Sequence, residues 1–180
     1  MNTNFFKRSA FAFLLIVVLA FTGAGIEFET KSLLGNKIML KIPKGFNIMS
    51  EEMAVLKYPA DRRPTLIYTN ESGGINVALN LTSNKAIQAQ MPAYKDNFVK
   101  AFKNLYPSAE WKQTGVKEVN GRKVGFIEFI TPAVDTKIYN LIFFTDLNGQ
   151  LLLCTFNCTE KNIGQWQPAA QEIMASLKLK

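Results

Sequence analysis

The sequence contains no histidine, and this absence excludes most of the common catalytic and metal-binding arrangements. Ser-His and Cys-His nucleophile pairs need an imidazole as general base, and the usual zinc and transition-metal sites use its ring nitrogens. The sequence also lacks the GxxxxGK[ST] loop that cradles phosphate groups and any GxGxxG that follows a strand. We therefore predict a protein that is not an enzyme and that holds no cofactor and no metal ion.

Cysteine is nearly as scarce, because Cys154 and Cys158 are the only two in the chain. Both fall in an apolar stretch, residues 150–158, that has the composition of a strand. Four residues along a strand separate two Cα atoms by about 13 Å, roughly twice the reach of a disulfide. Unless this strand is broken, we expect two packed thiols, so the domain must depend on its hydrophobic core for stability.

Long apolar runs are absent except for one, residues 11–21. Lys7 and Arg8 precede it and small residues follow it, which is the layout of a signal peptide. The run is about half as long as a bilayer-spanning helix. We predict cleavage after Ala24 and an extracytoplasmic location, either secreted or in the periplasm or cell envelope. The alternative is an uncleaved anchor over residues 9–26. No cysteine follows the run, so a lipoprotein anchor is not expected.

The net charge is modest and is spread along the chain. The full sequence carries 21 basic and 14 acidic residues; removal of residues 1–24 takes away two basic residues and leaves +5. The remaining basic residues form no run, and an exported protein does not ordinarily meet nucleic acid. We predict that the protein binds no nucleic acid and that its charge serves solubility or weak contact with an anionic cell surface.

The composition shows no repeat, no low-complexity tract and no flexible linker, so we predict that residues 25–180 form a single domain. Periodicity and turn signals favour an α+β fold. The expected strands are residues 26–30, 37–42, 65–69 and 74–81, followed by a meander over 111–158; the expected helices are a short one starting at Ser50, then 92–106 and 162–179.

The meander has turns that allow its register to be predicted. Two-residue Asn-Gly turns pair Val119 with Arg122 and Leu147 with Gln150, and a five-residue loop pairs Thr131 with Lys137. With this register both faces are apolar. One face carries Phe126, Ile130, Ile138, Ile142 and Phe144, and the other carries Ile127, Phe129, Leu141, Phe143, Leu152 and Phe156. Since an antiparallel sheet with one wet face alternates apolar and polar residues, we predict helices on both faces, a three-layer α/β/α sandwich.

Polar side chains cross this apolar sheet in one row. The predicted register aligns Gln113, Glu128, Asn140 and Asn157 side by side across the four strands of the meander. A buried polar group without a partner costs about 1 to 3 kcal/mol. The row is therefore either an internal hydrogen-bond network, a solvent-exposed end of the sheet, or a site for a ligand or partner.

A second candidate site is the dipeptide Arg62-Arg63, which precedes Pro64. It has the character of a basic loop that could bind an acidic partner. Loop charges of this kind are commonly just solvated, so both interpretations stay open.

Several local signatures occur in a familiar order. They are Ile42-Pro43-Lys44-Gly45-Phe46 after a strand, the helix start Ser50-Glu51-Glu52, Ile75-Asn76-Val77-Ala78 ahead of the long helix, Glu118-Val119-Asn120-Gly121-Arg122-Lys123, Thr155-Phe156-Asn157 and a final helix ending at Ser176-Leu177. In these features and their order the chain resembles the DcrB/PsbP-like superfamily. The resemblance implies an antiparallel sheet flanked by helices and a role in binding other proteins.

The functional expectation is an exported, non-catalytic interaction module of the cell envelope. Its partner would be another protein or an envelope component, with membrane contact only through an uncleaved signal segment. The alternative is a small-molecule carrier or an atypical enzyme that uses a pocket between helix and sheet, with Glu128 as its acid.

Overall fold

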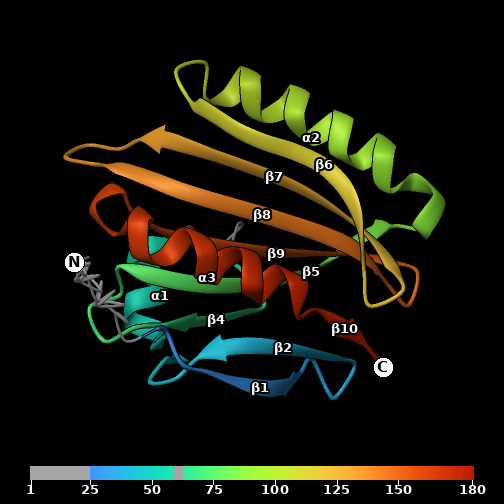
Figure 1. The fold of residues 1–180 in the computed structure, drawn as a ribbon, viewed down its shortest axis with the longest axis horizontal. Helices are drawn as coiled ribbons and strands as arrows, with labels where there is room; N and C mark the ends of the chain where they lie inside the picture. The colour runs from blue at the N-terminus through green and yellow to red at the C-terminus, as the bar shows by residue number, and fades with distance from the viewer. Residues whose placement is uncertain (1–24, 59–62) are drawn as a thin grey trace, which may run out of the picture.

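The computed structural model describes residues 25–58 and 63–180. The predicted signal peptide, residues 1–24, lies outside the described residues. The described part contains two antiparallel sheets and three α-helices, which confirms the predicted α+β class (Figure 1). None of these helices has the length and apolar character needed to cross a bilayer.

The larger sheet has seven strands in the order β3-β4-β5-β9-β8-β7-β6. Its strands are β3 (Asn47–Ile48), β4 (Leu66–Thr69), β5 (Ile75–Lys85), β6 (Glu110–Val119), β7 (Arg122–Pro132), β8 (Lys137–Leu147) and β9 (Gln150–Thr159). Strands β6 to β9 are consecutive antiparallel neighbours, so the predicted meander is confirmed. The Asn-Gly turns give the predicted pairs, because Asn120 and Asn148 adopt the positive φ values of 49° and 52° that such turns need.

A smaller, three-stranded sheet was not predicted. It has the order β1-β2-β10, with β1 (Phe28–Leu33), β2 (Ile38–Pro43) and β10 (Lys178–Leu179). The last predicted helix therefore ends early, and the chain then enters a two-residue strand beside β2. The inward residues of β2, Ile38, Leu40 and Ile42, have no exposed surface.

The helices begin close to their predicted positions. They are α1 (Glu51–Lys57), α2 (Met91–Leu105) and α3 (Ile163–Ala175). One turn of 3₁₀ helix, Gln88–Gln90, leads into α2. The Ser50 hydroxyl accepts a hydrogen bond from the Met53 amide at 3.3 Å, which caps α1 as predicted.

Helices α2 and α3 contact side chains that leave β7 in opposite directions. Phe129 of β7 packs against Phe102 of α2, with ring centroids 5.4 Å apart. Glu128, its neighbour in the strand, accepts hydrogen bonds from α3. Successive side chains in a strand point to opposite faces, so the two helices contact opposite sides of this strand.

Helical cover is incomplete in the middle of the face that α1 and α2 share. Ile67 and Ala78 are buried in a cluster with Ala54 of α1, whereas Leu153 and Thr155 are only half-buried. These last two side chains help to line a depression of about 170 Å³. The structure therefore supports mixed layers of helix and sheet but not the simple picture of a sheet with helices across both faces.

The predicted register between β7 and β8 is wrong by one residue. Pro132 pairs with Lys137, and Thr131 pairs with Ile138. The connection is a four-residue loop, closed by a hydrogen bond from the Ala133 amide to the Thr136 carbonyl at 2.8 Å. A slip of one residue moves every side chain of a strand to the other face. Phe126 therefore packs in the same cluster as Leu141, Phe143 and Phe156, and not with Phe144.

Cys154 and Cys158 are buried and unpaired in an unbroken β9, as predicted. Burial raises the pKa of the Cys154 thiol, and it raises the pKa of Cys158 to about 12. Both thiols are therefore protonated near neutral pH and are unreactive as nucleophiles.

Candidate functional site

Glu128 lies beneath α3 and is sealed from solvent. Its side chain is 1% exposed and accepts three hydrogen bonds, all from neutral donors. The Tyr139 hydroxyl donates at 3.1 Å, the Gln167 amide at 2.5 Å and the Gln171 amide at 2.9 Å. Burial, together with the nearby Glu128 carboxylate, raises the pKa of the Tyr139 phenol well above its usual value. This arrangement fixes α3 to the sheet and leaves no free acid for a substrate.

The four residues of the predicted polar row do not share one face. Glu128 pairs with Leu141, and Asn140 pairs with Phe129, because of the altered register. Asn140 and Asn157 do pair directly. Gln113 is exposed at the edge strand β6, next to a bulge, where it lines a groove of about 200 Å³ with Trp111.

The neighbour of Asn157 on the other side is Asn76, which the sequence analysis did not single out. The Asn76 amide donates to Asn157 at 2.9 Å and to the Gly73 carbonyl at 3.3 Å. Burial raises the pKa of Tyr58, an effect partly offset by a hydrogen bond with Asn157. These residues line a depression of about 260 Å³ between α1 and the end of β9. The oxygen of the Asn76 side-chain amide is enclosed and has no hydrogen-bond partner among the described residues. No ligand can reach this atom without a rearrangement.

The second predicted site is only half described. Arg62 lies outside the described residues. The Arg63 guanidinium forms an ion pair with Glu51 of α1, so its charge is already paired within the chain. The structure thus gives Arg63 a role in tethering the start of α1.

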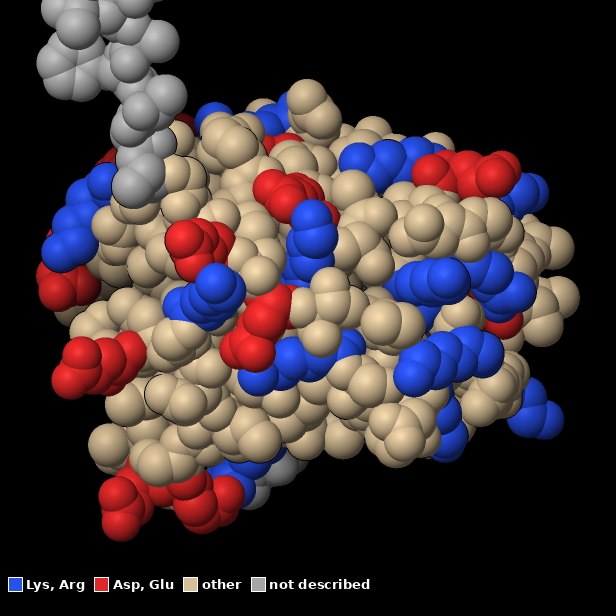
Figure 2. Space-filling view, turned by 60° about the horizontal axis from the view of Figure 1, so that its bottom comes forward, with Lys and Arg blue, Asp and Glu red and all other residues tan. Residues whose placement is uncertain are grey.

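Basic side chains gather at one end of the molecule, which we call the basic end: Lys37, Arg122, Lys123, Lys178 and Lys180. Figure 2 shows blue side chains, those of Lys and Arg, gathered toward the right of the view, the side on which Figure 1 places the C-terminus. Hydrogen bonds join the segments that carry them. The Lys180 amide donates to the Lys37 carbonyl at 3.0 Å, and the Asn120 amide side chain donates to the Leu177 carbonyl at 2.9 Å.

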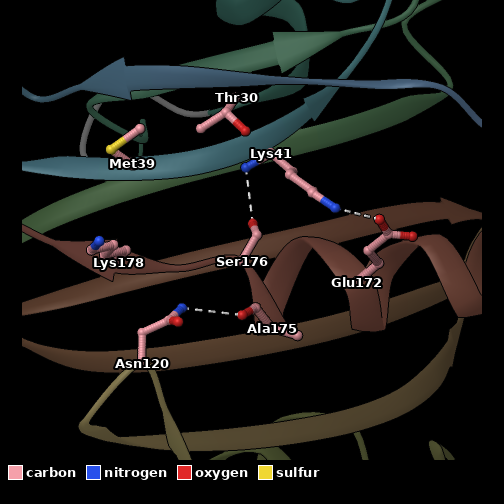
Figure 3. Close-up of a pocket in the computed structure, with 8 residues that line it drawn as sticks. All are labelled: Thr30, Met39, Lys41, Asn120, Glu172, Ala175, Ser176 and Lys178. Carbon is pink, nitrogen blue, oxygen red and sulfur yellow. Dashed lines mark hydrogen bonds and ion pairs between the residues drawn. The ribbon is translucent and has the colours of Figure 1, made fainter.

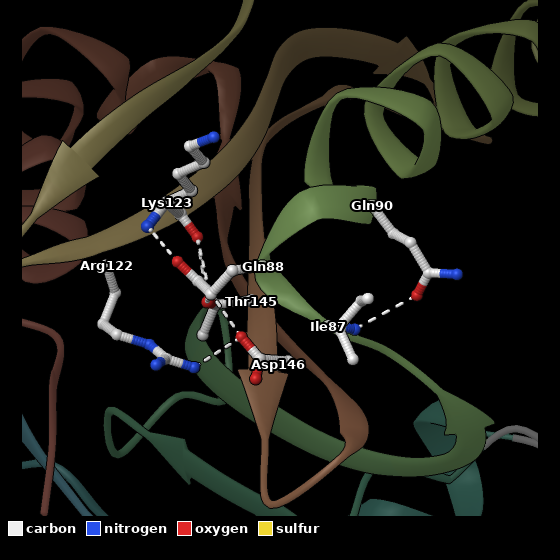
Figure 4. Close-up of polar contacts among 7 residues, drawn as sticks. All are labelled: Ile87, Gln88, Gln90, Arg122, Lys123, Thr145 and Asp146. Atoms are coloured by element: carbon white, nitrogen blue, oxygen red, sulfur yellow. Dashed lines mark hydrogen bonds and ion pairs between the residues drawn. The ribbon is translucent and has the colours of Figure 1, made fainter.

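A polar network holds the β7 part of the basic end in place (Figure 4). Gln88 accepts a hydrogen bond from the Lys123 amide at 2.6 Å and donates to Thr145 at 3.0 Å and to Asp146. Arg122 forms an ion pair with Asp146 at 2.6 Å. The Asp146 carboxylate is largely buried. The ion pair orients the Arg122 side chain and neutralises the charge of Asp146.

The largest depression described here, about 380 Å³, adjoins the basic end (Figure 3). Its walls are β2 and the end of α3, and Lys178 lies at its border. An ion pair between Lys41 and Glu172 at 2.6 Å crosses it. The Ser176 hydroxyl accepts from the Lys41 amide at 2.9 Å, which satisfies part of the open edge of β2.

Chemically, these features favour binding. Within residues 25–58 and 63–180, no three His, Cys, Asp or Glu side chains are grouped so as to hold a metal ion. The sequence analysis missed the basic end because its residues are spread between positions 37 and 180. Only the topology, with the C-terminal strand beside β2 and the β6–β7 turn against Leu177, brings them together.

Comparison with known proteins gives a fold but no sequence family. No protein-family model and no curated protein matches the chain. Cyanobacterial PsbP (CyanoP) from Synechocystis sp. PCC 6803 matches with a TM-score of 0.60 and 14% identity, over 88% of this chain and 96% of that one. LpqN, involved in cell envelope biogenesis of Mycobacterium tuberculosis, matches with a TM-score of 0.53 and 10% identity, over 86% and 91%.

A third structure, from Bacteroides thetaiotaomicron, matches with a TM-score of 0.50 and 11% identity. The match covers 87% of this chain and 48% of that longer one. At these identities the likeness concerns the arrangement of strands and helices alone. Together with the element order described above, it shows that the chain has a PsbP-like fold.

Proposed function

We propose that the chain is an exported, non-catalytic interaction module of the cell envelope that acts by binding another protein. In this proposal residues 1–24 are a signal peptide and residues 25–180 are the working domain. The proposal includes a three-layer arrangement, with α2 and α3 on opposite faces of the large sheet and the small sheet on the side of α3.

The observation that carries the proposal is the sealing of Glu128. Among the predicted site residues Glu128 was the one acid suited to chemistry, and it is enclosed by Tyr139, Gln167 and Gln171. A catalytic acid must be within hydrogen-bond reach of a substrate. Among the described residues, Glu128 lines none of five surface depressions of about 170 to 380 Å³. This geometry supports a structural role for the acid and favours a binding protein over the alternative, a carrier or atypical enzyme.

The fold comparison adds weak support for the location. LpqN is described as involved in cell envelope biogenesis, and the present chain carries the apolar run of a signal peptide at residues 11–21. An envelope location for this chain is consistent with both observations. Because the same fold can serve unrelated functions, this support extends to location and no further.

The test uses the full chain in its native host, with an epitope tag inserted after Val134, whose side chain is fully exposed in the β7–β8 loop. Cell fractionation should place a product cleaved after Ala24 outside the cytoplasm. Cross-linking in intact cells should give a defined protein adduct, and native mass spectrometry of the purified chain should show no bound small molecule. A bound metabolite that Glu128→Gln removes would establish the carrier function and refute this proposal.

A further inference from the structure

We infer that the basic end is a docking surface for an acidic patch on a folded partner protein. This inference rests on the proposed function and deepens it by naming the surface and the chemistry of the partner. It is carried by three properties of the surface: its charge, its rigidity and its shape.

Three of the five positive charges of the basic end are not neutralised from within. Lys37, Lys178 and Lys180 form no ion pair with any described residue, and all three are exposed. Of the acids nearby, Asp146 is already bound by Arg122. Glu118 pairs across β6 and β7 with Lys123 and is the only exposed acid beside that turn. Carboxylates on a partner could therefore pair with the free ammonium groups of Lys37, Lys178 and Lys180.

The surface is also rigid. The Asn120 side chain ties the β6–β7 turn to the chain between α3 and β10, and Gln88 ties β7 to the start of α2. Lys180 donates to Ser32 at 2.9 Å from its ammonium group. The backbone segments that carry the basic residues are held in this way and lose little conformational freedom on binding, so a partner with fixed, matching acids gains affinity. A fluid membrane or a flexible polyanion gains less from such fixed spacing.

The shape of the surface favours a protein over a membrane. Beside Lys178 the 380 Å³ depression offers both apolar walls, Met39 and Ala175, and polar groups, so it can receive a partner side chain. Membrane-binding surfaces combine basic residues with apolar side chains that insert among the lipids. One large exposed hydrophobic, Ile87, precedes Gln88 beside the basic end, whereas Leu105 and Val134 lie at the far ends of α2 and of the β7–β8 pair. A single apolar side chain is much less than such an inserting surface requires.

The experiment starts with photo-cross-linking in intact cells. A photoreactive residue is placed at Lys178 or Lys37 of the full chain, and at Lys100 on the exposed side of α2 as control. We expect one protein adduct from the two basic-end positions and none from Lys100. The captured protein is then purified, and its affinity is measured against two triple variants of equal charge change.

The test variant carries Lys37→Glu, Lys178→Glu and Lys180→Glu. The matched control carries Lys100→Glu, Lys112→Glu and Lys161→Glu, all at exposed positions. We expect the test variant to bind at least about tenfold more weakly at low salt and the control to bind like the native chain, with added salt weakening native binding. Equal melting temperatures show that both variants fold.

Three outcomes would overturn the inference. The test variant could bind the captured protein as tightly as the control does. The adduct could form from Lys100 and not from the basic end, which would leave the proposed function intact. The native chain could bind vesicles of phosphatidylglycerol and phosphatidylcholine without any protein, and lose this binding in the test variant. Failure to obtain any protein adduct from any position counts against the proposed function itself.

Discussion

The Tyr139 hydroxyl donates a hydrogen bond to the Glu128 carboxylate at 3.1 Å between two adjacent strands, and neither residue has more than 1% of its surface exposed. Glu128 pairs in register with Leu141, so the two partners are diagonal neighbours on the face beneath α3. This contact joins the meander to the helix through the glutamines at 167 and 171.

Replacement of Glu128 should destabilise the protein. Glu128→Ala leaves the donors of Tyr139, Gln167 and Gln171 without a partner in a buried site, and we expect a loss of about 3 kcal/mol or more in the free energy of unfolding. Urea denaturation measures this loss. The control Glu118→Ala, at an exposed position of β6, should change stability by less than about 0.5 kcal/mol. Equal stability of the two variants would contradict the structural role of Glu128.

Stability should decline in alkaline solution. Burial raises the pKa of Tyr139 above its usual 10.0, that of Cys158 from 9.0 to about 12, and that of Cys154 above its usual 9.0. All three groups are neutral when protonated, so above pH 9 to 10 the unfolded chain loses these protons first and becomes more stable relative to the folded chain. The free energy of unfolding should therefore be unaffected below about pH 9 and fall above it by about 1.4 kcal/mol per pH unit for each group.

Urea titrations from pH 7 to 11 in a reducing buffer test this dependence. Tyr139→Phe removes one of these groups and should make the decline shallower. A decline of unchanged slope in that variant would show that Tyr139 does not contribute to it.

The Asn120 side chain should stabilise the end of α3. It donates to the Ala175 carbonyl at 3.3 Å and to the Leu177 carbonyl at 2.9 Å. Asn148 occupies the matching turn position, with φ 52° against 49°, and makes no such contact among the described residues. Asn120→Ala should therefore cost about 1 kcal/mol more than Asn148→Ala, since the strain at positive φ is common to both. Equal losses in the free energy of unfolding would mean that the two hydrogen bonds of the Asn120 side chain do not stabilise the protein.

Gly125 should tolerate no side chain. A Cβ atom added there would overlap the ring of Phe144, which packs beneath α2. We expect Gly125→Ala to cost about 2 kcal/mol through overpacking, measured by thermal and urea unfolding. Gly164→Ala is the control, because an added Cβ there meets open space in α3. A stable Gly125→Ala protein would indicate that Phe144 moves freely to another rotamer.

Much of the fold follows from local signals in the sequence. Asn-Gly turns and alternating apolar residues were enough to predict the meander, and the Ser50 cap was enough to place α1. The register of β7 and β8 was not predictable, because residues 132–136 are compatible with loops of four or five residues. That choice alone decided whether Glu128 lies beside Asn140 or beneath α3.

The small sheet and the basic end escaped prediction for another reason. Lys178 and Leu179 continue the spacing of a helix, and nothing local distinguishes two residues of strand. Their conformation depends on β2, which lies more than a hundred positions earlier in the chain. Asn76 was missed in the same way, because its contact with Asn157 joins β5 to β9 and is visible only once the strand order is known.

β10 covers the backbone of β2 at Ile38 and Met39. Deletion of residues 178–180 would remove two ammonium groups and uncover this edge of β2 in a single step. An uncovered strand edge invites pairing with another chain. Such a deletion would weaken attraction for acidic surfaces and promote self-association, while the core around Phe143 and Phe156 stayed folded.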